Sequence, residues 1–261
     1  MQIMKKYLKN FMKYRHLLGE LVKKDIKLKY RRSYLGILWT LIEPLLTMIV
    51  LSTVFGSLYG RTDRTFPVYV LTGRLLYAYF ANSTKACMRS IRSHSGMIKK
   101  VYVPKYIYPL SSVCSNYVTF LISLIVLVVV SIVLKVNINA YILLSFIPLL
   151  LMFIMAYGVG MILATLSVFF RDLEYLWSVA LMIIMYTAAI FYPVERLYTT
   201  GKGWILELNP LYSLISLFRS CVFGYPMEMR HLLYAGIFSV GSLIIGLLLF
   251  YKKQDKFILY V

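Results

Sequence analysis

Six apolar runs, each long enough to cross a lipid bilayer, limit what this chain can fold into. A helix needs about 20 apolar residues to span roughly 30 Å of hydrocarbon, where every backbone polar group must be bonded within the protein. Hydrophobic residues make up 60% of the 261 residues, more than a soluble domain of that length buries. The sequence therefore predicts an all-α membrane protein with six transmembrane helices, at residues 35–59, 66–88, 106–134, 141–170, 175–194 and 232–251.

The cationic residues divide unequally between the two sides of these predicted spans. The chain has 29 Lys and Arg against 10 Asp and Glu, a net charge of +19. Of the 29 cations, 21 lie on one side: before the first span, in 85–105, at Arg171, or after the last span. Cytoplasmic loops carry such an excess, so we expect both termini to be cytoplasmic. Anionic lipid explains the clustered charge, and nucleic acid is not expected as a partner.

Residues 1–34 place apolar side chains among lysines at close to a helical period, which predicts an amphipathic helix lying on the membrane surface. Residues 35–251 would form the transmembrane domain and 252–261 a cytoplasmic tail. Glu43 lies beside Pro44, and it either holds the kink there, pairs with Arg31 or Arg32, or reaches water at the interface. The residues predicted to lie at the membrane interface are Lys27, Lys29, Arg31, Arg32, Trp39 and Glu43.

The segment between the fifth and sixth spans is too apolar for a solvated loop. Asn209 followed by Pro210 is typical of a helix start, and Gly224 is typical of a helix end. A helix over 211–223 is too short to cross the bilayer, and apolar runs of that length are typical of re-entrant or interfacial segments. We therefore expect short re-entrant helices between spans five and six.

Four stretches carry a family resemblance: RRSYLGILWTLIEPLL at 31–46, VFFRDLEYL at 168–176, FYPVERL at 191–197 and LNPLYSLISLFR at 208–219. In this order they resemble the permease subunit of bacterial ABC-2 type transporters that export polysaccharides such as O-antigen, capsule and teichoic acid. The resemblance implies a homodimer in the bacterial cytoplasmic membrane that moves a lipid-linked glycan. Asp172, beside Arg171 in the second stretch, is expected to form a salt bridge at the end of a span.

The chain has no phosphate-binding motif of the GxxxxGK[ST] type, so it is not expected to bind a cofactor or to be an enzyme. The resemblance implies a separate ATPase subunit that carries ATP and Mg²⁺. The basic loop 85–105 is the predicted docking site, although a cytoplasmic loop obeying the charge bias would look the same. Its predicted tip comprises Gly96, Met97, Ile98, Lys99 and Lys100.

Aromatic residues make up 16% of the chain, and many are expected in belts at the two interfaces. Others lie within the spans or at their outer ends, where aromatic faces could stack weakly on sugar rings and let a glycan slide past. The candidates for this pore-lining role are Tyr77, Tyr79, Phe80, Phe153, Tyr157, Tyr186, Phe191 and Tyr192.

Arg74 is a cation inside the second predicted span. An Arg near a helix centre costs roughly 2.5–3.5 kcal/mol on insertion scales, so it needs a partner or a wet environment. Two interpretations remain open. Arg74 either extends to the external surface, or faces the pore and marks the cargo as anionic, because a guanidinium binds phosphate or carboxylate in a bidentate manner.

Three other functions compete with glycan export. An ABC-2 exporter of drugs or small lipids shares the same architecture. An ion-coupled transporter is disfavoured, because it usually needs titratable residues at mid-membrane and spans three to six hold none at their centres. A membrane transferase is disfavoured because the ten acidic residues are dispersed.

The predicted topology can be tested by cysteine labelling. A cysteine introduced at Asn139 or Gly201 should react with a membrane-impermeant thiol reagent added outside the cell, because both residues follow an outward crossing. A cysteine at Ser95 should stay unlabelled until the membrane is permeabilised. The reverse labelling pattern would contradict the predicted orientation.

Overall fold

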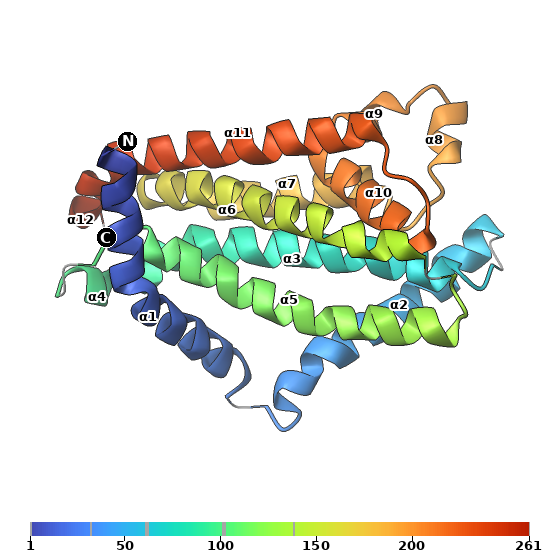
Figure 1. The fold of residues 1–261 in the computed structure, drawn as a ribbon, viewed down its shortest axis with the longest axis horizontal. Helices are drawn as coiled ribbons and strands as arrows, with labels where there is room; N and C mark the ends of the chain where they lie inside the picture. Colours follow the sequence, from blue (N-terminus) through green and yellow to red (C-terminus); the bar gives the residue numbers. More distant parts are fainter. Residues whose placement is uncertain (1, 32, 61–62, 101–102, 138, 261) are drawn as a thin grey trace.

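A computed structural model describes residues 2–31, 33–60, 63–100, 103–137 and 139–260, and these residues form helices and turns without a strand. Four long helices, α3, α5, α6 and α11, run alongside one another as a bundle, and both chain termini lie at the same end of it (Figure 1). The helices are α1 Gln2–Tyr30, α2 Trp39–Tyr59, α3 Phe66–Ser93, α4 Ser95–Ile98, α5 Ile107–Val133, α6 Phe146–Phe169, α7 Leu173–Thr187, α8 Glu195–Thr199, α9 Trp204–Glu207, α10 Pro210–Phe223, α11 Met229–Lys253 and α12 Phe257–Tyr260.

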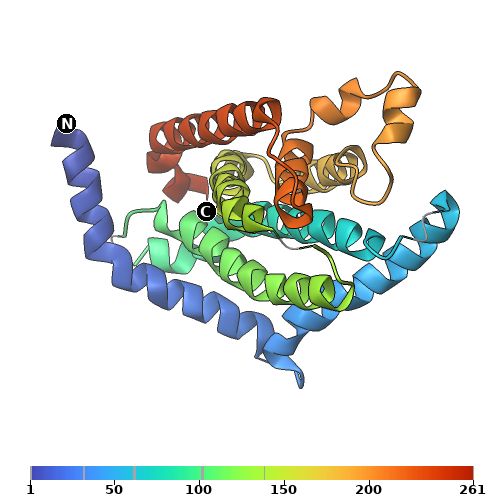
Figure 2. The ribbon, with the colours of Figure 1, turned by 45° about the vertical axis from the view of Figure 1, so that its right-hand side comes forward.

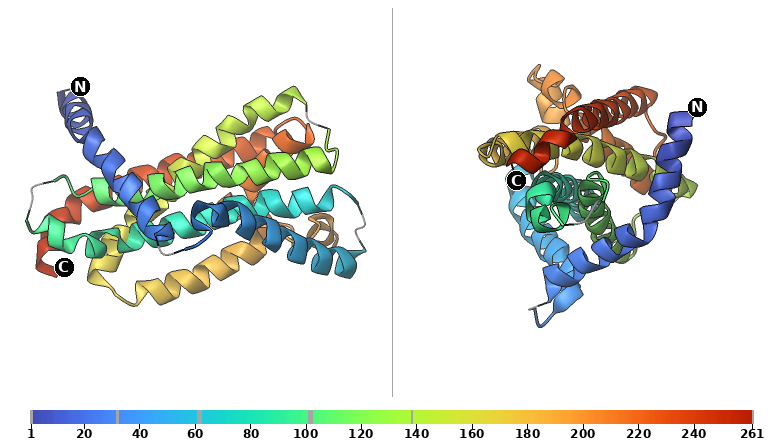
Figure 3. Two further views of the ribbon diagram at one scale, coloured as in Figure 1. Left: turned by 90° about the horizontal axis from the view of Figure 1, so that it is seen from below. Right: turned by 90° about the vertical axis from the view of Figure 1, so that its left-hand side faces the viewer.

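Short 3₁₀ turns precede or follow three of these helices, at Gly36–Leu38, Ala140–Ser145 and Gln254–Lys256. The first turns of α1 project away from the bundle (Figure 2), and the rest of α1 crosses the bundle end and packs on α5 (Figure 3). Helix α7 lies at an edge of the bundle (Figure 3).

The all-helical prediction is confirmed, and four helical segments of the described chain are long and apolar enough to cross a membrane. They are Gly36–Tyr59, Ile107–Val133, Ala140–Phe169 and Met229–Lys256. Helix α3 has 28 residues but carries charged side chains along its length. The fifth predicted span is a helix of only 15 residues, about 22 Å long, and a non-helical turn follows it. Helix α7 therefore ends at Thr187, within the predicted fifth span at 175–194.

Helices α6 and α11 pack closely because glycines face each other where they cross. A Cβ atom added to Gly158 would lie 2.4 Å from the backbone nitrogen of Leu243, and one added to Gly246 would lie 2.5 Å from the Gly158 carbonyl oxygen. Small residues allow such backbone contact between apolar helices in the absence of a hydrophobic driving force. Helix α6 also packs on α3 and α5, so it forms the centre of the bundle.

Helix α10 begins and ends as the sequence predicts. The Asn209 side-chain oxygen accepts a hydrogen bond of 3.0 Å from the Leu211 backbone N–H, and Pro210 occupies the first turn. Gly224 ends the helix with a φ of 77°, a left-handed conformation that glycine adopts without strain. The Asn209 amide also donates to the Ile184 carbonyl at 3.0 Å, so the cap fastens α10 to α7.

A buried arginine joins α10 to the non-helical turn after α7. Arg219 is only 7% exposed, and its guanidinium donates to the carbonyl oxygens of Tyr69 and Ala189, both at 3.0 Å, and of Ile190 at 3.4 Å. The guanidinium also lies 3.4 Å from the centre of the Tyr69 ring. A Cβ atom on Gly73 would lie 2.8 Å from an Arg219 nitrogen, so glycine makes room for it. Ala189 and Ile190 follow the end of α7, so Arg219 bonds two carbonyl groups that lie outside any helix and a third, that of Tyr69, within α3.

The described part of the predicted C-terminal tail packs back on the bundle. Phe257 is fully buried and its ring contacts Phe250 and Phe169, at centroid distances of 5.2 and 6.1 Å. The Lys105 ammonium donates to the Gln254 carbonyl at 2.7 Å. The tail, the end of α6 and the segment before α5 therefore form one cluster.

Replacing Arg219 with Leu should destabilise the protein, because three carbonyl groups would each lose a donor in a buried site. A loss of several buried hydrogen bonds should lower the melting temperature of the detergent-solubilised protein by about 5–10 °C. The matched control is Arg230→Leu, which removes only an exposed ion pair with Glu207 and should change the melting temperature little. Equal effects of the two substitutions would contradict this role of Arg219.

Candidate functional site

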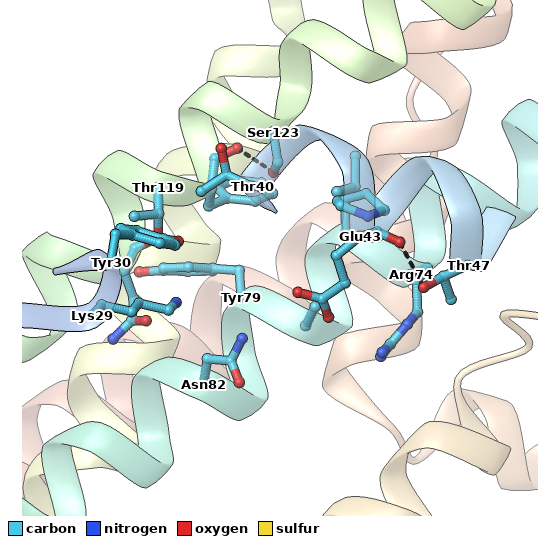
Figure 4. A pocket seen from close by; sticks show the side chains of 15 residues that line it. Lys29, Tyr30, Thr40, Glu43, Thr47, Arg74, Tyr79, Asn82, Thr119 and Ser123 are labelled. Atoms are coloured by element: carbon cyan, nitrogen blue, oxygen red, sulfur yellow. Dashed lines mark hydrogen bonds between the residues drawn. The ribbon is translucent and has the colours of Figure 1, made fainter. Parts of the chain in front are cut away.

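Polar side chains from α1, α2, α3 and α5 line a continuous groove on one side of the chain. It consists of two adjoining pockets of about 80 and 620 Å³ that share Lys29, Asn82 and Asn116. Figure 4 shows the smaller pocket, with Glu43 and Thr47 from α2, and with Arg74, Tyr79 and Asn82 from α3. In a chain so rich in apolar residues, this concentration of hydroxyl, amide and charged groups is the candidate functional site, called the polar groove below.

The spacing of polar residues explains how the helices form the groove. On α3, Arg74, Asn82, Lys85 and Arg89 recur three, four or eight residues apart and so lie on one face. On α5 the same pattern places Ser112, Asn116, Thr119 and Ser123 on one face, and on α2 it places Thr40, Glu43 and Thr47. This amphipathic pattern inside apolar helices is the sequence signal that could have located the groove.

On α2, the side chains near Pro44 bond to the helix itself. The Thr47 hydroxyl donates to the Glu43 carbonyl at 2.7 Å, and the Thr40 hydroxyl donates to the Ile37 carbonyl at 2.7 Å. The Glu43 side chain extends into the pocket (Figure 4), and no ion-pair partner for it lies among the residues that the structure describes. Arg31 is exposed, and Arg32 lies outside the described residues.

The cationic and acidic groups where α1 borders the groove influence each other's pKa. Packing of protein around the Lys29 ammonium lowers its pKa from the ordinary value, and the Glu43 carboxylate opposes this shift. Burial raises the pKa of the Asp25 carboxyl, against the influence of His94 and Lys24.

Arg74 lies on the groove wall, eight residues or about 12 Å along α3 from Phe66. Its guanidinium lies 5.8 Å from the centre of the Tyr77 ring. No hydrogen-bond or ion-pair partner for it lies among the described residues. The guanidinium therefore keeps its five donors for water or a ligand.

Of the eight aromatic residues predicted to line a pore, Tyr79 is the one that lines the polar groove. Tyr77, Phe80 and Phe191 are buried like Tyr79, and each contacts another helix or turn of the same chain. Phe153 and Tyr157 are half-buried on α6, Tyr192 is half-buried after α7, and Tyr186 is 56% exposed on α7. The structure therefore does not bring the eight together on one surface of the single chain, and their role in a pore stays a prediction.

Helix α7 is fastened to α3 by polar contacts. Glu174 accepts from Arg89 at 2.9 Å and from Arg92 at 3.4 Å. Farther along, the Trp177 indole N–H donates to the Thr84 hydroxyl at 3.0 Å. The salt bridge predicted for Asp172 at the end of the span is wrong, because the Asp172 and Arg171 side chains are both exposed and unpaired among the described residues. The ion pairs with α3 are formed by Glu174.

Part of the predicted docking loop packs against the protein and part is exposed. Met97 and Ile98 pack against an apolar cluster that includes Leu21, Ile91 and Tyr108. Gly96, Lys99 and Lys100 are exposed at the bundle end that carries both termini. Among the predicted interface residues, Lys27 is exposed and Trp39 is 42% exposed.

Known proteins match this chain over the region that contains all the groove residues. A family model described as "ABC-2 type transporter" matches residues 16–223. The chain is 29% identical over 246 residues to the O-antigen export system permease protein RfbA of Klebsiella pneumoniae, covering 92% of this chain and 93% of that protein. It is 26% identical to RfbA of Myxococcus xanthus, with coverages of 94% and 95%. It is 24% identical to the polysialic acid transport protein KpsM of Escherichia coli, with coverages of 89% and 91%.

The attachment of α7 can be tested by substitution. Glu174→Gln should weaken both ion pairs with α3 and lower the free energy of unfolding by about 1 kcal/mol, a value suited to partly buried pairs. Asp172→Asn, two residues away and unpaired, is the control and should leave it unchanged. Chemical denaturation of the purified protein measures both. An equal loss in the two variants would show that charge near the end of α7, rather than this contact, stabilises the fold.

Proposed function

The chain belongs to the ABC-2 type transporter family, and we propose that it is the membrane-spanning subunit of an ATP-driven exporter of lipid-linked polysaccharide or a related glycan. The names of its relatives, permeases for O-antigen export and a transport protein for polysialic acid, support this cargo. The chain is a transport subunit rather than an enzyme, and ATP is hydrolysed on a separate ATPase subunit.

The observation that carries the proposal is the polar groove. A glycan presents many hydroxyl groups, and moving polar groups through hydrocarbon without hydrogen-bond partners is costly. Side chains such as Asn82, Asn116 and Thr119 offer replaceable partners along the groove wall. A drug or small-lipid exporter would instead favour a wall of mostly aliphatic side chains, so the groove favours the glycan.

The proposed assembly places the chain in the bacterial cytoplasmic membrane as a homodimer. Helices α2, α3, α5, α6, α7 and α11 would be the six spans, with α8, α9 and α10 forming the re-entrant region on the external side. An even number of crossings agrees with both termini lying at one end of the bundle (Figure 1). A second copy would close the open side of the groove and complete a conduit, while α1 rests on the lipid headgroups.

Export can be measured in cells that lack the chain. Surface polysaccharide should be lost, lipid-linked polymer should accumulate inside, and the full-length chain should restore export when supplied on a plasmid. A matched vector without the gene controls for the plasmid. Normal surface polysaccharide combined with increased drug sensitivity would instead favour the drug-exporter alternative.

The ATPase is proposed to dock at the exposed part of the loop, Gly96, Lys99 and Lys100. Because Met97 and Ile98 pack inward, substitutions there would disturb the fold as well as any docking. Reversing both charges, Lys99→Glu with Lys100→Glu, should reduce co-purification of the ATPase and export at least tenfold while the protein remains in the membrane. The control is the charge reversal Lys202→Glu between α8 and α9, two helices that lie at the other end of the bundle (Figure 1). Wild-type ATPase binding by the double variant would remove this loop from the interface.

A further inference from the structure

Arg74 and Arg219 both lie among apolar residues, and they differ in their hydrogen bonding. Arg219 is fully supplied with acceptors: three backbone carbonyl groups and the Thr72 hydroxyl. Arg74 has none among the described residues, although it lies well inside α3. Since an unpaired cation in an apolar environment is unfavourable, acceptors for Arg74 would come from water, a ligand or a second copy of the chain.

The pocket beside Arg74 is suited to a small anion. Its volume of about 80 Å³ accommodates several water molecules or one group the size of phosphate, rather than a whole oligosaccharide. Lys29 lines the same pocket from α1, so two cations from different elements face it. Asn82 and Thr47, also in the lining, add polar side chains. Figure 4 shows Lys29 and Arg74 on either side of the space that Glu43 enters.

We propose that this pocket binds one phosphate-type anion, held in a bidentate manner by Arg74 and neutralised further by Lys29. Guanidinium geometry matches two oxygens of a phosphate, and the lysine ammonium acts as a point charge. The site as such does not depend on the proposed function. That the phosphate belongs to the lipid-linked cargo does rest on the proposed function.

Glu43 has a distinct role in this site. Its carboxylate enters the same pocket and is the acidic side chain among the residues that line it. When the pocket is empty, the carboxylate partly balances the two cations; when an anion enters, it repels the anion. Glu43 therefore weakens the affinity and favours release, which suits a site that cargo must leave. Removing its charge should have the opposite effect from removing that of Arg74.

The test uses the purified full chain in detergent and three probes: farnesyl pyrophosphate, dioleoyl phosphatidylglycerol and inorganic pyrophosphate. Native mass spectrometry measures the apparent Kd of each. Arg74→Leu should weaken binding roughly tenfold to a hundredfold, the effect of losing one charge-assisted contact, and Glu43→Gln should strengthen it roughly threefold to tenfold. The control is Lys202→Gln, an exposed cation between α8 and α9 that lines neither pocket of the groove, and it should change the Kd less than about twofold.

The melting temperatures of the variants establish that each is folded. Preference for farnesyl pyrophosphate indicates the cargo anchor as the source of the phosphate, preference for phosphatidylglycerol indicates a membrane lipid, and equal binding of inorganic pyrophosphate indicates a free ion; each supports the site. Unchanged Kd values for all three probes in folded Arg74→Leu and Glu43→Gln would overturn it. Because binding is measured without export, a failure of the proposed glycan function would leave these results unaffected.

Discussion

The hydrogen bonds of Arg219 to backbone carbonyl groups are the constraint on which the outer part of this fold depends. The chain stops being helical after Thr187, inside a run of apolar sequence, and so exposes carbonyl groups that water would normally bond. In a membrane such groups must find partners within the protein. Arg219 supplies donors from α10, and Gly73 on α3 leaves the space that they need. The turn after α7, the short helix α10 and the half of α3 that begins at Phe66 are therefore one unit.

This unit fixes the orientation of α3, and so decides which of its faces lines the polar groove. With its outer turns packed on Arg219 through Tyr69 and Thr72, α3 turns a different face, that of Arg74, Asn82 and Lys85, toward α1, α2 and α5. The buried face of the same helix carries apolar side chains such as Leu71, Leu76 and Met88. Helix α3 thus stabilises the bundle with one face and lines the polar groove with the other, which explains why it is long but less apolar than its neighbours.

The sequence predicted the features that depend on local interactions. The helical class follows from the apolar runs, and the limits of α10 follow from Asn209, Pro210 and Gly224, whose effects act within one turn. Features that depend on distant contacts were not predictable. The short α7 requires Arg219, 30 residues from Ala189, and Glu174 rather than Asp172 forms the ion pairs because of where α3 lies. Burial of Tyr77 and Phe191 likewise depends on helices far away in the sequence.

Helix α7 lies beside α3, the helix that lines the polar groove. Its outward face carries exposed apolar side chains such as Leu176, Val179 and Ile183, which suit lipid or a second copy of the chain. Its polar contacts with α3 are those of Glu174 with Arg89 and Arg92, of Trp177 with Thr84, and of the Leu181 carbonyl with the Tyr77 hydroxyl, and the Trp177 ring also packs edge-on against Phe80. Polar contacts of this kind exchange partners at lower cost than an interdigitated apolar interface. Because Arg89 also lines the polar groove, an anion that reached it would compete with Glu174 for the same guanidinium, and the groove and the attachment of α7 thus share one residue.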